Sequence, residues 1–122
     1  MRNCIAVGIG GFVGSVLRYL VSLLPIKPTN GFPLGTLVIN VAGSFAIGLI
    51  TALSIKSGDI SPRWILFMKA GICGGFTTFS TFSLEAGHLL QNGKVWLGCL
   101  YIVASVLLGV GAFFLAQAAV SH

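Results

Sequence analysis

Charged side chains are scarce in this sequence. Its 122 residues include seven lysines and arginines and two acidic residues, so 7% are charged, whereas 56% are hydrophobic. Soluble domains carry about 25% charged residues, so this composition excludes them and indicates an integral membrane protein. The net charge of +5 does not indicate a nucleic-acid partner, because the basic residues stand singly near the ends of apolar segments, where they suit lipid headgroups.

Cysteine and histidine are also few, and their spacing excludes several kinds of site. Cys4, Cys73 and Cys99 lie singly in apolar stretches without a C-x-x-C spacing, which predicts neither a disulfide framework nor a metal cluster. The sequence also lacks a nucleophile–base pair and a phosphate-binding loop. These absences predict that the protein is not an enzyme.

Long apolar runs fill most of the chain. A membrane span needs about 20 mostly apolar residues, and four segments qualify, at about 3–24, 34–55, 62–90 and 94–120. Short loops join them, and Ser61-Pro62 is typical of an N-cap followed by proline at the first helical position. The first segment is too long for the apolar part of a signal peptide. We therefore predict an all-α membrane protein in which residues 1–122 form one four-helix transmembrane domain.

The stretch Gly71–Ser83 does not suit a helix that only faces lipid. It combines three glycines, five hydroxyl residues and three phenylalanines at the centre of the third segment. Glycine and threonine are weak helix formers, and in hydrocarbon every freed backbone group needs another partner. We predict that the third helix is broken at mid-membrane, a known way to build ion sites from backbone groups.

Polar residues in the other spans follow helical spacing. Steps of three and four residues place them on single faces: Gly11, Gly14, Ser15, Arg18 and Ser22; Thr36, Asn40, Gly43, Ser44 and Gly48; Tyr101, Ser105, Gly109 and Ala112. Arg18 either extends to headgroups or lies at the mouth of an anion vestibule. Asn40, near mid-membrane, and Glu85, the only carboxylate in a span, are candidates for function or for interhelical hydrogen bonds.

The basic residues give almost no orientation bias. Four spans place both termini on one side with Arg2, Lys56 and Arg63, while Lys27 and Lys94 lie on the other. The positive-inside rule then favours neither orientation. Two oppositely inserted copies would form an inverted pair, so we predict an antiparallel, dual-topology homodimer with the broken third helices near its axis.

Three motifs carry a resemblance to a known family. They are Gly10-Gly11-x-x-Gly14-x-x-x-Arg18-Tyr19, Gly35-Thr36-Leu37-x-x-Asn40-x-x-Gly43-x-Phe45-x-x-Gly48, and, most specific, Gly74-Gly75-Phe76-Thr77-Thr78-Phe79-Ser80-Thr81-Phe82. With these motifs the sequence resembles the Fluc (CrcB-type) fluoride channels over essentially its whole length. That family forms dual-topology dimers with two fluoride pathways.

The resemblance implies roles for individual residues. Phe79 and Phe82 would present ring edges to fluoride, Asn40 would donate to it, and Tyr101 and Ser105 would line the path from the fourth helix. Arg18 would lie at the vestibule, with Ser80, Thr81 and Glu85 near the polar track. The backbone carbonyls of Gly74 and Thr77 from both subunits would hold a structural sodium ion. Some relatives carry serine where this chain has Gly109, so the resemblance implies one pore hydroxyl that this chain lacks.

The implied function is passive export of fluoride from the cytoplasm across the cell membrane, which protects against fluoride toxicity. Amides, hydroxyls and the positive edges of phenyl rings can each replace water around this small anion. One alternative is a small multidrug-type cation/proton exporter, which needs a carboxylate in the membrane, typically in its first helix. The first span here carries Arg18 and no carboxylate, so Glu85 in the third span is the only residue that could serve as the membrane carboxylate of such an exporter. The other alternative is a membrane scaffold that transports nothing.

Overall fold

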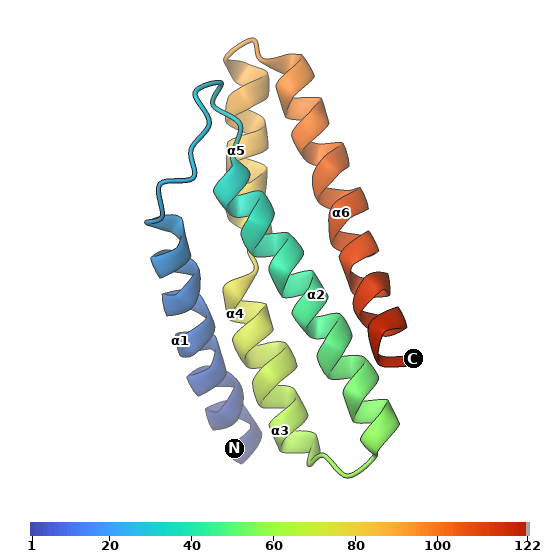
Figure 1. The fold of residues 1–122 in the computed structure, drawn as a ribbon. Coiled ribbons are helices and arrows are strands. Elements are labelled where there is room, and N and C mark those ends of the chain that lie inside the picture. Colours follow the sequence, from blue (N-terminus) through green and yellow to red (C-terminus); the bar gives the residue numbers. More distant parts are fainter. Residues whose placement is uncertain (122) are drawn as a thin grey trace.

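The computed structural model describes residues 1–121, and their regular structure is helical. Four helical stretches are long and apolar enough to cross a membrane: Arg2–Ser22, Leu34–Ser57, Pro62–Gln91 and Val95–Ser121. The first residues of the chain and the end of the last helix lie toward the same end of the bundle, as four crossings require (Figure 1). The prediction of four membrane-capable helices is confirmed.

Three of the stretches are single helices: α1 (Arg2–Ser22), α2 (Leu34–Ser57) and α6 (Val95–Ser121). Helix α2 ends at Ser57 and is followed by Gly58, whose φ of 70° is the left-handed conformation that glycine adopts without strain. The third stretch begins at Pro62 as predicted, but the Ser61 side chain makes no capping hydrogen bond. Ser61 still occupies the N-cap position and Pro62 the first helical position, so the prediction for this pair is confirmed.

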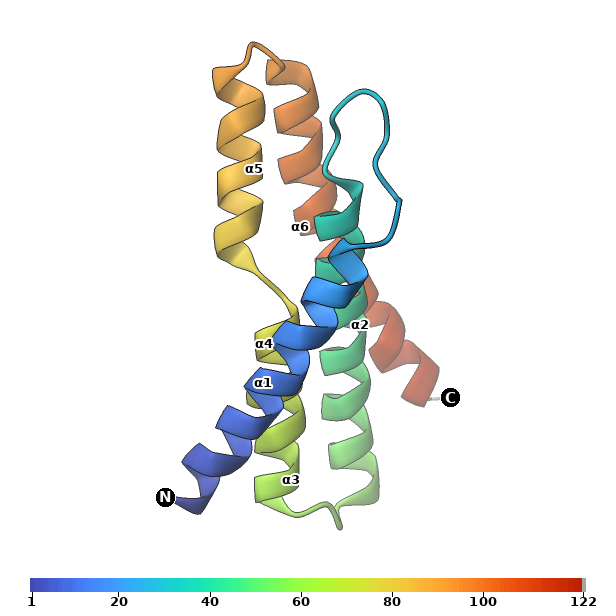
Figure 2. The same cartoon turned by 90° about the vertical axis from the view of Figure 1, so that its left-hand side faces the viewer.

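The third stretch is broken, as predicted. It consists of α3 (Pro62–Leu66), a π-helical segment η1 (Phe67–Cys73), a single turn α4 (Gly74–Phe76) and α5 (Phe79–Gln91). Thr77 and Thr78 between α4 and α5 have extended backbones, with ψ of 156° and 117°. Figure 2 shows α5 displaced sideways from α4 across this connection. The π-helical segment was not predicted, and such segments are frequent at functional sites.

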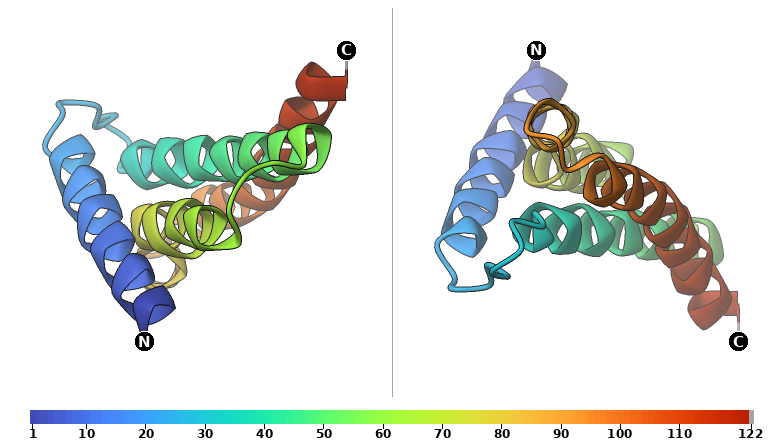
Figure 3. Two further views of the ribbon diagram at one scale, coloured as in Figure 1. Left: turned by 90° about the horizontal axis from the view of Figure 1, so that it is seen from below. Right: turned by 90° about the horizontal axis from the view of Figure 1, so that it is seen from above.

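Glycines allow two close helix crossings. Helix α1 runs obliquely along η1 and α4, where a Cβ on Gly10 would lie 2.5 Å from the Phe67 carbonyl oxygen, and one on Gly75 would lie 2.6 Å from that of Gly11. Helix α2 lies along α6, where a Cβ on Gly48 would lie 2.7 Å from the Phe113 carbonyl oxygen. Helices α1 and α6 thus flank α2 and the broken helix on opposite sides (Figure 3).

The buried core of one chain is small and lies between α2, α5 and α6. Leu37, Ala86, Leu89 and Tyr101 are its buried residues, with Phe32 and Phe82 packed against them. Many large apolar side chains are exposed instead, among them Phe12, Phe79 and Leu107, which are 71%, 79% and 66% exposed. Such a surface must be covered by lipid tails or by another protein.

Candidate functional site

Asn40 satisfies the backbone at the break in the third span. Its Nδ2 donates to the Thr78 carbonyl oxygen at 3.1 Å, and its Oδ1 accepts from the Thr78 backbone N–H at 2.8 Å. The Asn40 amide therefore takes the place of a neighbouring peptide group and stabilises the extended backbone of Thr78. A primary amide has two N–H donors, so the second N–H of Asn40 Nδ2 is not used by Thr78.

Thr78 also caps α5. Its Oγ1 accepts from the Thr81 backbone N–H at 3.1 Å, the usual role of an N-cap threonine. In a continuous helix, the N–H groups of Thr78 and Thr81 would bond the carbonyls four residues earlier, which are those of Gly74 and Thr77. Asn40 and the Thr78 hydroxyl take these two donors instead. The break thus releases the two carbonyls that the family resemblance assigns to sodium.

An aromatic row leads from the break into the core. The ring centroids of Phe79 and Phe82 are 5.7 Å apart, and those of Phe82 and Tyr101 are 5.1 Å apart, in both cases with tilted planes. Phe32 packs edge-on against Tyr101 at 5.5 Å. The row joins an exposed residue, Phe79, to a fully buried one, Tyr101.

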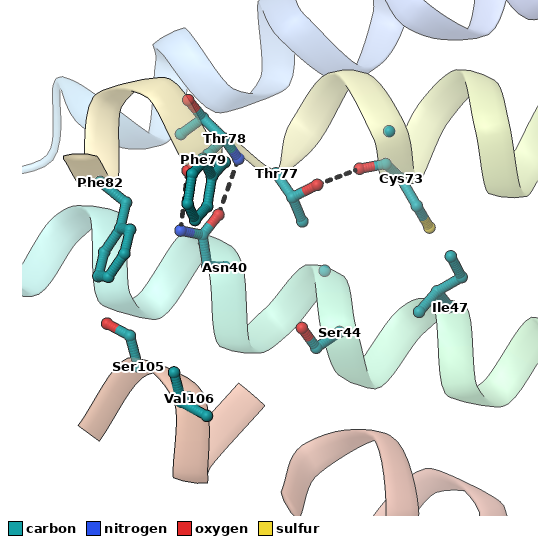
Figure 4. A pocket seen from close by; sticks show the side chains of 12 residues that line it. Asn40, Ser44, Ile47, Cys73, Thr77, Thr78, Phe79, Phe82, Ser105 and Val106 are labelled. Atoms are coloured by element: carbon teal, nitrogen blue, oxygen red, sulfur yellow. Dashed lines mark hydrogen bonds between the residues drawn. The ribbon is translucent and has the colours of Figure 1, made fainter. Parts of the chain in front are cut away.

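A cavity of about 410 Å³ lies beside the break (Figure 4). Four predicted pathway residues line it from three helices, namely Asn40, Phe79, Phe82 and Ser105. The Ser105 hydroxyl is buried without a hydrogen-bond partner among the described residues. A buried hydroxyl without a partner costs about 1–3 kcal/mol, so this geometry favours a bound polar species in the cavity.

A second cavity, of about 760 Å³, lies between the loop after α1 and α5. Thr81 and Glu85 line it, together with three side chains that were not predicted as site residues, Lys27, His88 and Lys94. Tyr101 links the two cavities, because its ring packs on Phe82 while its hydroxyl donates to Glu85 Oε1 at 3.1 Å. The predicted pathway residues are therefore divided between two cavities, and the Tyr101 proton is directed toward Glu85.

Three predicted site residues line neither cavity in the single chain: Tyr101, which lies between the two cavities, Arg18 and Ser80. The Nε of Arg18 donates to the Gly75 carbonyl oxygen at 3.1 Å, so this side chain connects α1 to α4. Ser80 is exposed, and its hydroxyl lies 3.4 Å from the Thr78 hydroxyl. The structure does not bring Arg18 or Ser80 together with the other predicted residues.

Sequence reasoning missed some contributors to the site. Thr78 was counted only as one of several hydroxyls, although its spacing to Thr81 is that of a helix N-cap. Thr77 turns its hydroxyl to the Cys73 carbonyl at 2.9 Å and packs its methyl group against Gly43. Ser44 lines the smaller cavity, and the signal for it was its place in the polar stripe of α2.

Comparison with known proteins gives one consistent match. The family described as CrcB-like protein, Camphor Resistance (CrcB) matches residues 5–117. The chain is 51% identical over 107 residues to a protein of Ruminiclostridium cellulolyticum named fluoride-specific ion channel FluC, covering 87% of this chain and 82% of that protein. Proteins of the same name from Chlorobaculum tepidum and Rhizobium meliloti are 43% and 46% identical, over 93% of this chain and 90% and 92% of their own lengths.

Proposed function

This chain belongs to the CrcB-like family, and on this premise we propose that it is a fluoride-selective ion channel. It is a multi-pass membrane protein and not an enzyme. Relatives from several species that are named as fluoride-specific channels support the assignment, and the names of these relatives mention no multidrug export. The cation-exporter and scaffold alternatives are therefore not favoured.

The observation that carries the mechanism is the donor set around the 410 Å³ cavity. Fluoride is small and strongly hydrated, so a path must offer donors that replace its water. The free N–H of Asn40 and the unpartnered O–H of Ser105 are such donors. The hydrogen-bearing edges of Phe79 and Phe82 supply further weak positive charge. Several weak sites suit conduction, because the ion must leave each one.

Transport through these sites is passive export. An inside-negative potential of about 100 mV favours the exit of a monovalent anion by about 2.3 kcal/mol, which corresponds to a concentration ratio of about 50. Fluoride that enters as neutral HF in acid surroundings and ionises inside would leave along this gradient. The channel then needs no coupled energy source.

The first test measures fluoride efflux from liposomes that contain the purified protein. We expect wild type to release fluoride, and Phe79→Ile and Phe82→Ile each to slow release by about tenfold, equivalent to about 1.4 kcal/mol. The reason is that isoleucine keeps apolar bulk but lacks a polarised ring edge. Phe12→Ile, on the exposed face of α1, is the matched control and should behave as wild type. No fluoride release from wild type would refute the channel assignment.

The chain works as an antiparallel homodimer, in which a second copy closes the smaller cavity. Phe79 at its rim is 79% exposed, and Gly74 beside it is exposed as well. Polar groups of Asn40, Thr77 and Ser105 cannot face lipid at this depth without large cost. An inverted copy offers the same residues across a two-fold axis in the membrane plane, and the balanced basic residues favour insertion in both directions.

Topology mapping tests this arrangement. A cysteine-free variant with one cysteine added after the C-terminus should be labelled in intact cells by an impermeant maleimide to about half of the total reached after permeabilisation. A membrane protein of known single orientation, tagged in the same way on its outer or its inner side, gives the signals for complete labelling and for no labelling in intact cells. Labelling of every copy from one side only would exclude the dual-topology dimer.

A sodium ion at the dimer axis stabilises this assembly. The carbonyl oxygens of Gly74 and Thr77 would hold it, with two from each subunit. Both carbonyls have lost their helical N–H partners to Asn40 and to the Thr78 hydroxyl, which leaves their lone pairs available. Neutral carbonyl oxygens are the usual ligands for monovalent cations in membrane proteins. The positive charge of the ion would offset the negative ends of the carbonyl dipoles that meet at the axis. The ion would take no part in the transport of fluoride.

A further inference from the structure

Four hydroxyl residues line the 410 Å³ cavity, and only two of them have hydrogen-bond partners. Thr77 donates to the Cys73 carbonyl, and Thr78 accepts from Thr81. Ser44 and Ser105 make no hydrogen bond within residues 1–121. This contrasts with Ser15, Thr51, Ser54 and Ser57, whose hydroxyls all bond the carbonyl three or four residues earlier, as is common in transmembrane helices.

Ser44 lies one helical turn beyond Asn40 on the same face of α2, and Figure 4 shows both side chains at this cavity. Across the cavity on α6, Ser105 is followed one turn later by Gly109. A Cβ on Gly109 would lie 3.5 Å from the Ser44 hydroxyl oxygen, so these two residues face each other. Asn40 and Ser105 therefore form one level of donors, and Ser44 and Gly109 form the next, about 6 Å further along the helices.

We propose that Ser44 is a fluoride-coordinating residue that, among residues 1–121, supplies the side-chain donor at this second level. Gly109 has no side chain and therefore supplies no donor opposite the Ser44 hydroxyl. An anion leaving the Asn40–Ser105 level is received by the Ser44 O–H, one helical turn further along α2 in the same cavity. This role rests on the proposed fluoride conduction.

The experiment removes the hydroxyl at position 44 on α2 and places one at position 109 on α6, on the opposite side of the cavity. Fluoride efflux from liposomes is measured for wild type, Ser44→Ala, Ser44→Ala/Gly109→Ser and Ser44→Ala/Gly109→Ala, with Ser44→Gly as a second way to delete the hydroxyl. We expect Ser44→Ala to slow efflux by about tenfold, because the second level then has no donor. The Gly109→Ser double variant should recover at least half of the wild-type rate, since a side chain at position 109 meets only ordinary contact distances. The Gly109→Ala double variant should not recover.

Two outcomes would overturn the assignment of Ser44. One is wild-type efflux in both Ser44→Ala and Ser44→Gly, and the other is recovery by Gly109→Ala equal to that by Gly109→Ser, which would show that volume and not the hydroxyl matters. Size-exclusion profiles and melting temperatures of each variant verify folding, and a variant that fails them is replaced by the other deletion. Failure of fluoride efflux in wild type would instead refute the channel function itself.

Discussion

Replacing Asn40 with leucine is expected to abolish fluoride efflux and to lower the free energy of unfolding by about 2–6 kcal/mol. Leucine has similar size but cannot bond the N–H and C=O of Thr78, which Asn40 holds at 2.8 and 3.1 Å. Each stranded backbone group costs about 1–3 kcal/mol in a low-dielectric interior. Where the Thr78 N–H bonds the Gly74 carbonyl again, the break partly closes and the loss falls in the lower half of this range.

Three measurements on the Asn40→Leu protein test this expectation: efflux from liposomes, the melting temperature, and the dependence of the melting temperature on sodium. If the released Gly74 carbonyl binds sodium, wild type should melt at a higher temperature in sodium than in choline, and the variant should lose this difference. A wild type that is insensitive to sodium would remove the sodium proposal and leave the role of Asn40 at the break intact.

Gln117→Leu is the matched control for Asn40→Leu. Gln117 also lies in a span and donates to a backbone carbonyl, that of Gly48, at 3.1 Å. Gly48 lies in the middle of α2, so its carbonyl keeps its helical partner when Gln117 is removed. We expect near wild-type stability and efflux from Gln117→Leu, and the same result from Asn40→Leu would contradict the bridging role.

Gly14→Ala should separate α1 from the broken helix. A Cβ on Gly14 would overlap the carbonyl oxygen of Ile72 and lie 2.8 Å from the backbone nitrogen of Phe76. Both contacts are with backbone, which cannot turn aside as a flexible side chain can. We expect a loss of about 3 kcal/mol or more, the upper range for overpacking, seen as a lower melting temperature and less monodisperse protein.

Gly8→Ala, in the same helix, is the control for Gly14→Ala. No atom lies within 4 Å of a Cβ built on Gly8, and alanine has the higher helix propensity by about 1 kcal/mol. Its stability should equal or exceed that of wild type. Equal stability of the Gly14 and Gly8 variants would mean that α1 does not approach η1 and α4 this closely.

Sequence alone determined the features that depend on local properties. The near absence of charge and the four apolar runs placed the chain in a membrane, because a run of about 20 apolar residues has the length that a membrane-spanning helix needs. The cluster of glycines and hydroxyls placed the break in the third span, because those residues support a helix poorly. Family motifs pointed to the fluoride pathway and to the residues that we propose for it.

Tertiary structure decided which groups the break uses. Asn40 and Thr78 are 38 positions apart, and only the crossing of α2 with the third span brings the amide onto that peptide. The same crossing frees the Gly74 carbonyl, and the packing of α1 turns Arg18 toward Gly75, where the sequence predicted a headgroup or a vestibule. Ser44 was one of several small residues on a polar stripe. It became a candidate ligand only when α6 placed Gly109 opposite it, because the distance between two helices is set by their packing and not by the residues of either one.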